Sequence, residues 1–145
     1  MRAALSIALT DSRVRALSRT YSGDLAVGDR VPEVPGSSGL ASISWDVARA
    51  QVTLGSSYIG RWRGYDWIGF LNSETDTTAP RPPLRNYLRD YAAVLKPFVS
   101  VSRGVRRDME WFGRVDNLTN RQNNERDNLQ ITAGRTFTVG LRIGR

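Results

Sequence analysis

The chain has 145 residues and a formal net charge of +7, with 40% hydrophobic and 24% charged residues, which is typical of a folded domain rather than a disordered chain. It contains no cysteine and no histidine. Disulfides, thiolate nucleophiles, cysteine or histidine metal ligands and a Ser-His-Asp triad are therefore excluded.

The basic residues are 20 arginines and the single Lys96, and they are scattered along the chain. Such an excess of cations fits an anionic partner such as nucleic acid or lipid headgroups, and it also fits the arginine usage of a high-GC genome. Because the arginines form no continuous stripe, we favour the compositional explanation. No run of 18 apolar residues occurs, so no transmembrane helix is expected.

A period-two alternation of apolar and polar residues recurs six times in chain order. The first instance, Arg2 to Thr10, has an apolar stretch that is too short and too soon followed by polar residues for a signal peptide, and we interpret it as a strand. The apolar positions of the six segments are Ala3, Leu5, Ile7 and Leu9; Ala41, Ile43, Trp45 and Val47; Ala50, Val52, Leu54 and Tyr58; Ala93, Leu95, Val99 and Val101; Met109, Trp111, Gly113 and Val115; and Phe137, Val139, Leu141 and Ile143. Each segment predicts a strand with one apolar and one polar face.

The connections between these segments alternate strictly between short and long. Tight turns are expected from Val47 to Ala50 and from Arg103 to Arg107, whereas residues 10–39, 61–90 and 118–133 form long connections. The long ones hold most turn-forming residues: Gly28-Asp29, Pro32, Pro35-Gly36, the Pro80 to Pro83 cluster and Asn123-Asn124. Short loops at one end and long loops at the other are typical of outer-membrane barrels. We predict an all-β, antiparallel up-and-down meander of about six strands that is part of a transmembrane β-barrel.

The C-terminal third carries a two-part motif, which consists of Arg114-Val115-Asp116-Asn117-Leu118-Thr119-Asn120-Arg121-Gln122 and, after a polar loop, of Gly134 to Ile143. This motif resembles the end of a TonB-dependent outer-membrane receptor: its first part resembles the corner after that family's penultimate strand, and its second part resembles the last strand. Gly28 to Pro35 and Gly60 to Trp67 also fit, so the resemblance covers most of residues 1–145. The motif and structural residues are Asp116, Asn117, Leu118, Asn120, Gly134, Phe137, Val139, Gly140, Leu141 and Ile143.

The resemblance implies a fragment of a receptor in the bacterial cell outer membrane that imports a scarce solute such as a siderophore. Its partners would be membrane lipid, the remaining strands and plug of the parent receptor, and an energy-coupling TonB-type complex. We expect no plug domain within this chain, and six strands cannot close a barrel of about 22 strands. The family usually ends in an aromatic residue, whereas this chain ends in Arg145.

One segment combines arginines with aromatic residues and is the candidate ligand-binding loop. Such residues bind an anionic or flat ligand through charge, stacking and cation–π contacts. An interfacial aromatic belt with snorkelling arginines is the alternative interpretation. The candidate residues are Arg61, Trp62, Arg63, Tyr65, Asp66 and Trp67.

No motif for catalysis, cofactor binding or metal binding stands out. The acidic groups Asp24/Asp29/Glu33 and Glu74/Asp76 are interpreted as solvated turn residues, and Asn117 and Asn120 as turn caps. We therefore expect no enzyme activity, no cofactor and no metal. The alternative to a receptor fragment is a small soluble basic β-barrel that binds single-stranded nucleic acid with arginine and aromatic side chains.

Overall fold

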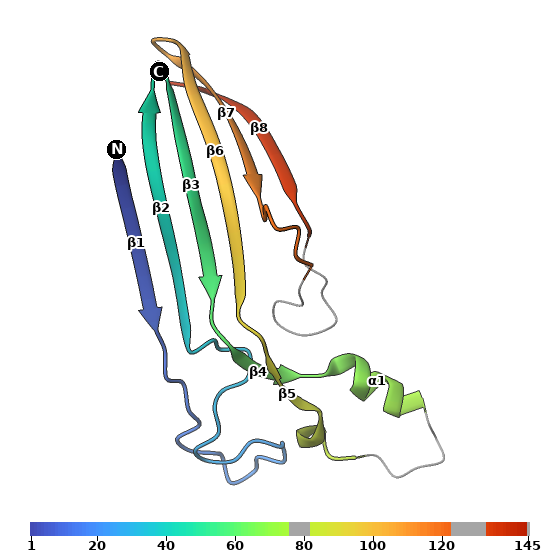
Figure 1. Cartoon of the computed structure of the whole chain (residues 1–145). Coiled ribbons are helices and arrows are strands. Elements are labelled where there is room, and N and C mark those ends of the chain that lie inside the picture. Colours follow the sequence, from blue (N-terminus) through green and yellow to red (C-terminus); the bar gives the residue numbers. More distant parts are fainter. Residues whose placement is uncertain (76–81, 123–132, 145) are drawn as a thin grey trace.

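The fold is one antiparallel six-stranded sheet with a smaller extension at one end (Figure 1). The computed structural model describes residues 1–75, 82–122 and 133–144. In spatial order the sheet contains β1 (Arg2–Leu9), β2 (Ser37–Val47), β3 (Ala50–Ile59), β6 (Val94–Arg106), β7 (Met109–Asp116) and β8 (Thr136–Ile143). All six period-two segments are strands, which confirms the predicted all-β meander.

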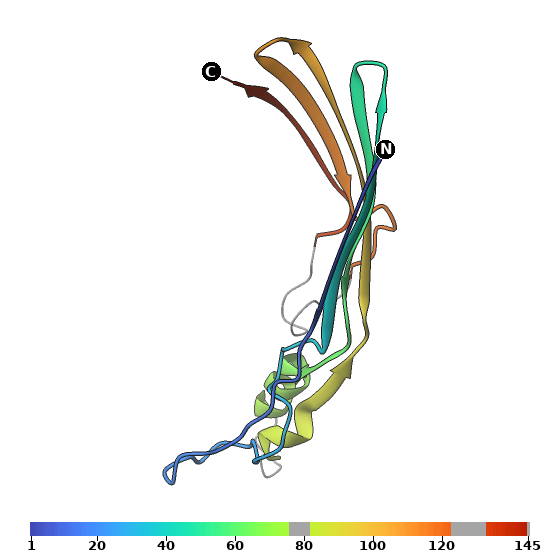
Figure 2. The same ribbon diagram turned by 90° about the vertical axis from the view of Figure 1, so that its left-hand side faces the viewer.

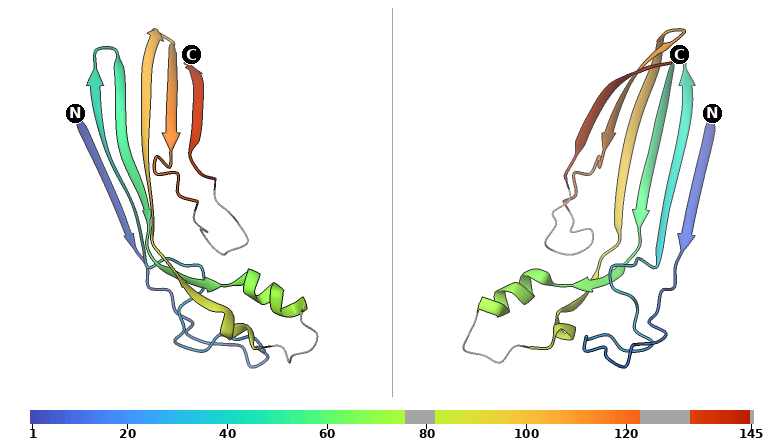
Figure 3. Two further views of the ribbon diagram at one scale, coloured as in Figure 1. Left: turned by 45° about the vertical axis from the view of Figure 1, so that its right-hand side comes forward. Right: turned by 180° about the vertical axis from the view of Figure 1, so that it is seen from behind.

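The connections are sorted between the two ends of the sheet, as the sequence predicted. Tight turns at 48–49 and 107–108 join β2 to β3 and β6 to β7. The β1–β2 connection lies at the opposite end, beside the extension (Figure 3). Strand β6 continues to Arg106, so the second turn lies further along the chain than expected. The predicted turn formers at 80–81 and 123–124, together with Asp76 and Arg145, lie outside the described residues.

The strand register places the apolar positions of all six strands on one face. Residues paired across antiparallel strands share a face, and Leu54 pairs with Ile43 on one side and with Val99 on the other. At the far edge of the sheet Trp111 pairs with Leu141. The opposite face carries mostly Ser, Thr, Gln, Arg and Glu side chains. The sheet therefore has one apolar face, called the apolar face below, and one polar face.

The apolar face has no second layer of the described chain over it. Figure 2 shows the strands as a single bent layer. Leu5 is 72% exposed, Val139 80% and Ile143 73%, although such side chains are normally buried. Within the described residues the buried hydrophobic side chains are Trp62, Tyr65, Val94 and Phe98. The small core thus lies in the extension and on the polar face, not beneath the apolar face.

The extension prolongs the β3–β6 hairpin beyond the sheet. It contains β4 (Trp62–Tyr65), α1 (Trp67–Thr75), the 3-10 helix η1 (Leu84–Tyr87) and β5 (Leu88–Tyr91). Strands β4 and β5 pair antiparallel as a separate two-stranded sheet. At the junction the N–H of Gly60 donates to the Ser37 carbonyl at 2.7 Å, and a Cβ there would lie only 2.9 Å from that oxygen. The long connection predicted at 61–90 is present between β3 and β6, but its pattern did not predict the short elements β4, α1, η1 and β5 that it contains.

The sheet is not closed, because β1 and β8 each have a neighbour on one side only within the described residues. These strands therefore do not form the closed small barrel that the nucleic-acid-binding alternative requires. In the described part of the chain, no helix has both the length and the apolar character required to cross a bilayer.

Candidate functional site

The candidate ligand-binding segment, residues 61–67, lies in the extension at the long-loop end of the sheet (Figure 1). Trp62 to Tyr65 form strand β4 rather than a loop, because Trp62 pairs with Tyr91 and Tyr65 with Leu88. Its alternation points the arginines outward: Arg63 is exposed, whereas Trp62 is 4% exposed. The partner strand begins more than 20 residues later in the chain, so the local pattern gave no signal for this pairing.

The aromatic rings of the extension contact one another instead of lining an open site. Trp62 and Tyr91 stack with centroids 5.5 Å apart and an interplanar angle of 4°. Trp67 contacts Tyr65 at 5.2 Å and Phe70 at 5.9 Å. Such ring pairs contribute roughly 0.5–1.5 kcal/mol beyond their buried area. The aromatic residues therefore stabilise the extension itself.

Asp66 has a structural role at the start of α1. It is 4% exposed, forms an ion pair with Arg89, and accepts a hydrogen bond from the N–H of Gly69 at 2.9 Å. A carboxylate at this position satisfies a free N–H of the first helical turn and interacts favourably with the helix dipole. Of the six candidate residues, Arg61 and Arg63 are exposed and Trp67 is half-buried, so these three face the surroundings.

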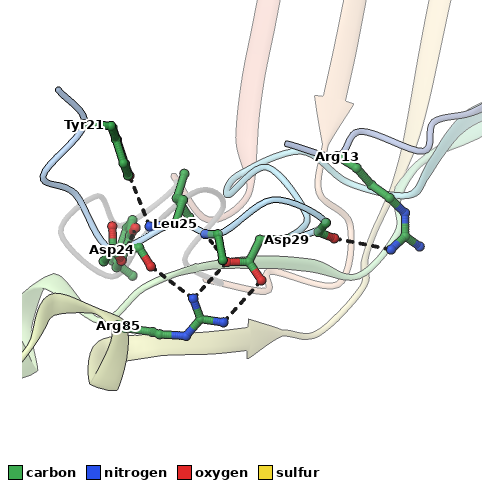
Figure 4. A network of polar contacts seen from close by, with 9 residues as sticks. Arg13, Tyr21, Asp24, Leu25, Asp29 and Arg85 are labelled. Atoms are coloured by element: carbon green, nitrogen blue, oxygen red, sulfur yellow. Dashed lines mark hydrogen bonds and ion pairs between the residues drawn. The ribbon is translucent and has the colours of Figure 1, made fainter. Parts of the chain in front are cut away.

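A network of polar contacts ties the connection between β1 and β2 to the extension (Figure 4). The Tyr65 hydroxyl donates to Asp24 at 2.7 Å. The Arg85 guanidinium donates to both carboxylate oxygens of Asp29, at 2.9 and 3.2 Å, and to the Asp24 carbonyl at 3.0 Å. Asp24 and Asp29 lie in the connection between β1 and β2, as expected, but they also have specific long-range side-chain partners instead of contacting water alone. Their partners are 41 and 56 residues away, and local sequence carries no signal for such contacts.

The network shifts the proton affinities of its members. The backbone N–H of Ala26, followed by the Arg85 guanidinium, lowers the pKa of Asp29 below its usual 3.8. Burial, followed by the hydrogen bond to Asp24, raises the pKa of Tyr65. Asp29 therefore stays ionised and Tyr65 stays protonated at neutral pH, which keeps both contacts formed. Within the described residues no group of three or more acidic side chains is placed to hold a metal ion.

The corner after β7 is built by two asparagines, as the sequence predicted. Asn117 is 3% exposed, with its Nδ2 donating to the Arg121 carbonyl at 2.7 Å and its Oδ1 accepting from the Arg121 N–H at 3.1 Å. Asn120 accepts from the Arg135 N–H at 2.8 Å. Both have positive φ, 54° and 51°. A Cβ at Gly134 would lie 2.5 Å from Asn120 Oδ1, which explains the glycine there.

The remaining motif residues divide between the corner and the two faces of β7 and β8. Leu118 donates its N–H to the Pro97 carbonyl at 2.9 Å, which attaches the corner to β6. Asp116 lies on the polar face and pairs with Arg114. On β8, Gly140 faces the polar side and accommodates the Phe112 ring, 2.5 Å from where its Cβ would stand. The apolar-face positions of β8 are Phe137, Val139, Leu141 and Ile143, and all four are exposed.

The polar face forms a shallow hollow of about 280 Å³ across β3, β6, β7 and β8. Its charged groups are paired, since Arg142 contacts Glu110 at 3.0 Å and Arg114 contacts Asp116 at 2.7 Å. The Arg114 guanidinium also lies 3.9 Å from the centre of the Phe98 ring. The hollow is lined by Gln51, Thr53, Ser100, Val101, Ser102, Glu110, Phe112, Arg114 and Arg142. This face suits contact with water or a polar partner.

Comparison of the chain with family models, with curated proteins and with solved structures found no match in any of the three.

Proposed function

We propose that this chain is a membrane-embedded segment of an outer-membrane β-barrel, corresponding to the C-terminal strands of a TonB-dependent receptor in a bacterial cell. The observation that carries the proposal is the exposed apolar face of a single-layered sheet. Contiguous apolar surfaces of this extent are rare on water-soluble proteins and mark contact with lipid or another protein. In a membrane barrel the outward residues of every strand contact lipid.

The strand lengths support this assignment. Strand β2 has 11 residues, which at about 3.4 Å per residue gives roughly 34 Å between its first and last residue. A tilt of about 40° leaves a depth of roughly 26 Å, close to the apolar band of about 25 Å in such barrels. Soluble strands most often have about five or six residues. The three long strands β2, β3 and β6, with 11, 10 and 13 residues, thus have the length of a bilayer crossing, whereas β1, β7 and β8 have eight residues each.

The open edges of β1 and β8 require further strands, because an unpaired backbone edge is not tolerated in hydrocarbon. Under the proposal these come from the rest of a receptor barrel, and the polar face lines its interior. Import of a scarce solute, a plug and a TonB-type energy-coupling complex follow from the resemblance of the C-terminal motif alone. Arg61, Arg63 and Trp67 lie at the long-loop rim, where an incoming anionic or flat solute would first contact the barrel.

Because the chain has no native cysteine, lipid contact is testable with single-cysteine variants. Val139→Cys on the apolar face and Thr138→Cys on the polar face are neighbours in the middle of β8 and form a matched pair. Each variant of the full chain carries an environment-sensitive fluorophore and is diluted from denaturant into phosphatidylcholine vesicles containing a nitroxide quencher in the acyl chains.

We expect strong quenching at position 139 and weak quenching at position 138. A second pair, Leu54→Cys and Thr53→Cys in β3, should repeat the contrast at a central strand. Equal quenching within both pairs, or none at all, would refute the lipid-facing assignment.

A further inference from the structure

Two arginines interrupt the otherwise uncharged apolar face, and both lie at its tight-turn end. Arg103 pairs with Trp111 across β6 and β7 and therefore shares its face. Arg106 pairs with Met109, which in turn pairs with Ile143 on the apolar face. The apolar-face positions at the long-loop end of the strands carry no charge among the described residues.

A β-bulge places both arginines on the same side. The pairing of β6 with β7 shifts by one residue between Gly104 and Arg106. Without that shift, residues three apart on a strand would point to opposite faces, and Arg106 would turn to the polar face. Bulges commonly redirect a side chain in this way. The strand therefore directs a second cation to the apolar face.

A third arginine joins them from the neighbouring turn. Arg49 lies in the tight turn between β2 and β3, and a hollow of about 340 Å³ is lined by Val47, Ala48, Arg49, Ala50 and Arg103. Arg49, Arg103 and Arg106 make no ion pair and no side-chain hydrogen bond with the described part of the chain. Arg85 and Arg142 have acidic partners, whereas Arg15, Arg19 and Arg30 in the connection after β1 resemble the three arginines in having none within the described residues.

Two tryptophans lie near the same end of the same face. Trp111 is directly opposite Arg103. Trp45 lies two residues before the end of β2, close to the other tight turn. Tryptophan is enriched where a bilayer meets water, because its ring is apolar and its N–H is polar. Arg49, Arg103 and Arg106, together with Trp45 and Trp111, are called the basic collar below.

We infer that the basic collar binds the phosphates of anionic glycerophospholipid headgroups in the leaflet nearest the tight turns. This inference rests on the proposed membrane function. Guanidinium groups bind phosphate oxygens through paired hydrogen bonds, and their aliphatic stems can lie along apolar surface. An unpaired cation beside hydrocarbon is costly, whereas at headgroup level it attracts anionic lipid. The occupant is therefore lipid phosphate rather than a soluble anion, because the collar borders the apolar face.

The test compares three forms of the full chain: the native sequence, a collar variant and a matched control. The collar variant is Arg49→Gln/Arg103→Gln/Arg106→Gln. The control is Arg15→Gln/Arg19→Gln/Arg30→Gln, which removes the same charge from exposed arginines in the long connection after β1. Vesicle flotation measures the affinity for phosphatidylcholine vesicles and for vesicles with an equal amount of phosphatidylglycerol, at low and high salt.

We expect the native chain to bind both vesicle types, with a salt-sensitive preference for the anionic one. The collar variant should keep its affinity for phosphatidylcholine vesicles. Its preference, which is the ratio of the affinities for anionic and phosphatidylcholine vesicles, should fall about fivefold for each arginine removed, corresponding to about 1 kcal/mol per cation near an anionic surface. The control should retain most of the preference.

Three outcomes would overturn the inference. A native chain with no preference for anionic vesicles, or a control that loses as much preference as the collar variant, would remove the collar site and leave the membrane assignment intact. A native chain that binds neither vesicle type would refute the proposed function as well. The two failures are therefore distinguishable.

Discussion

Replacing Asn117 tests whether the corner after β7 is held by one side chain. Asn117 is buried and adopts φ of 54°, and its amide both donates to and accepts from Arg121. Asn117→Gly keeps the backbone conformation accessible but removes both hydrogen bonds with Arg121, each of which contributes about 0.5–1.5 kcal/mol, so a loss of about 1–3 kcal/mol is expected. Asn117→Ala loses the same hydrogen bonds and adds a left-handed conformation disfavoured by about 1 kcal/mol or more. The alanine variant should therefore be destabilised by about 2–4 kcal/mol.

The assay is urea unfolding of the full chain in detergent micelles, monitored by tryptophan fluorescence. Trp111 on β7, the strand that leads into this corner, serves as a reporter. The difference between the alanine and glycine variants isolates the backbone contribution, and the glycine variant alone isolates the hydrogen bonds. Destabilisation of both variants by less than about 0.5 kcal/mol, the level of an ordinary surface substitution, would refute the reasoning. Equal values for the two variants would show that the positive φ carries no cost.

Three further predictions follow from the two faces and the polar network. Phe137→Asp puts a charge on the apolar face and should weaken vesicle insertion by roughly 1–2 kcal/mol, whereas Thr138→Asp on the polar face should not. Equal insertion of both variants would contradict a lipid-facing β8. Gly55→Ala would place a Cβ 2.8 Å from the Ala41 carbonyl oxygen on the neighbouring strand and should lower the free energy of unfolding in urea by about 1–3 kcal/mol. Gly104→Ala would place a Cβ with no other atom within 4 Å and should leave that free energy nearly unchanged. The pKa of Asp29 should lie below 3.8 in a carbon-13 NMR titration, so the stability that its ionised form contributes is present above that pH and is lost as the pH falls through the folded pKa. Arg85→Gln should raise the midpoint of this titration. An unchanged midpoint would exclude the ion pair with Arg85 as a cause of the lowered pKa.

The outcome for residues 61–67 shows what a local pattern cannot specify. Interleaved arginine and aromatic residues predicted an open ligand-binding loop, but Trp62 and Tyr65 are buried because β5 and Asp24 approach from distant parts of the chain. Only Arg61, Arg63 and Trp67 keep the accessibility that ligand contact requires. The solute-contact hypothesis therefore now depends on these three residues.

The sequence by itself determined the strands, their two faces and the sorting of short and long connections. The physical reason is that neighbouring side chains of a strand point to opposite faces, so a period of two is visible without any knowledge of partners. The Asn117 cap was equally readable, because it bonds Arg121 only four residues away, whereas the hydrogen bond of Asn120 with Arg135 spans 15 residues and depends on the tertiary structure.

Only the tertiary structure decided the pairing of β4 with β5, the attachment of Asp29 to Arg85, and the face of Arg106. The first two depend on contacts between residues 20 or more positions apart, which local composition does not encode. The third depends on a one-residue register shift, and a shift of one residue exchanges the two faces of a strand.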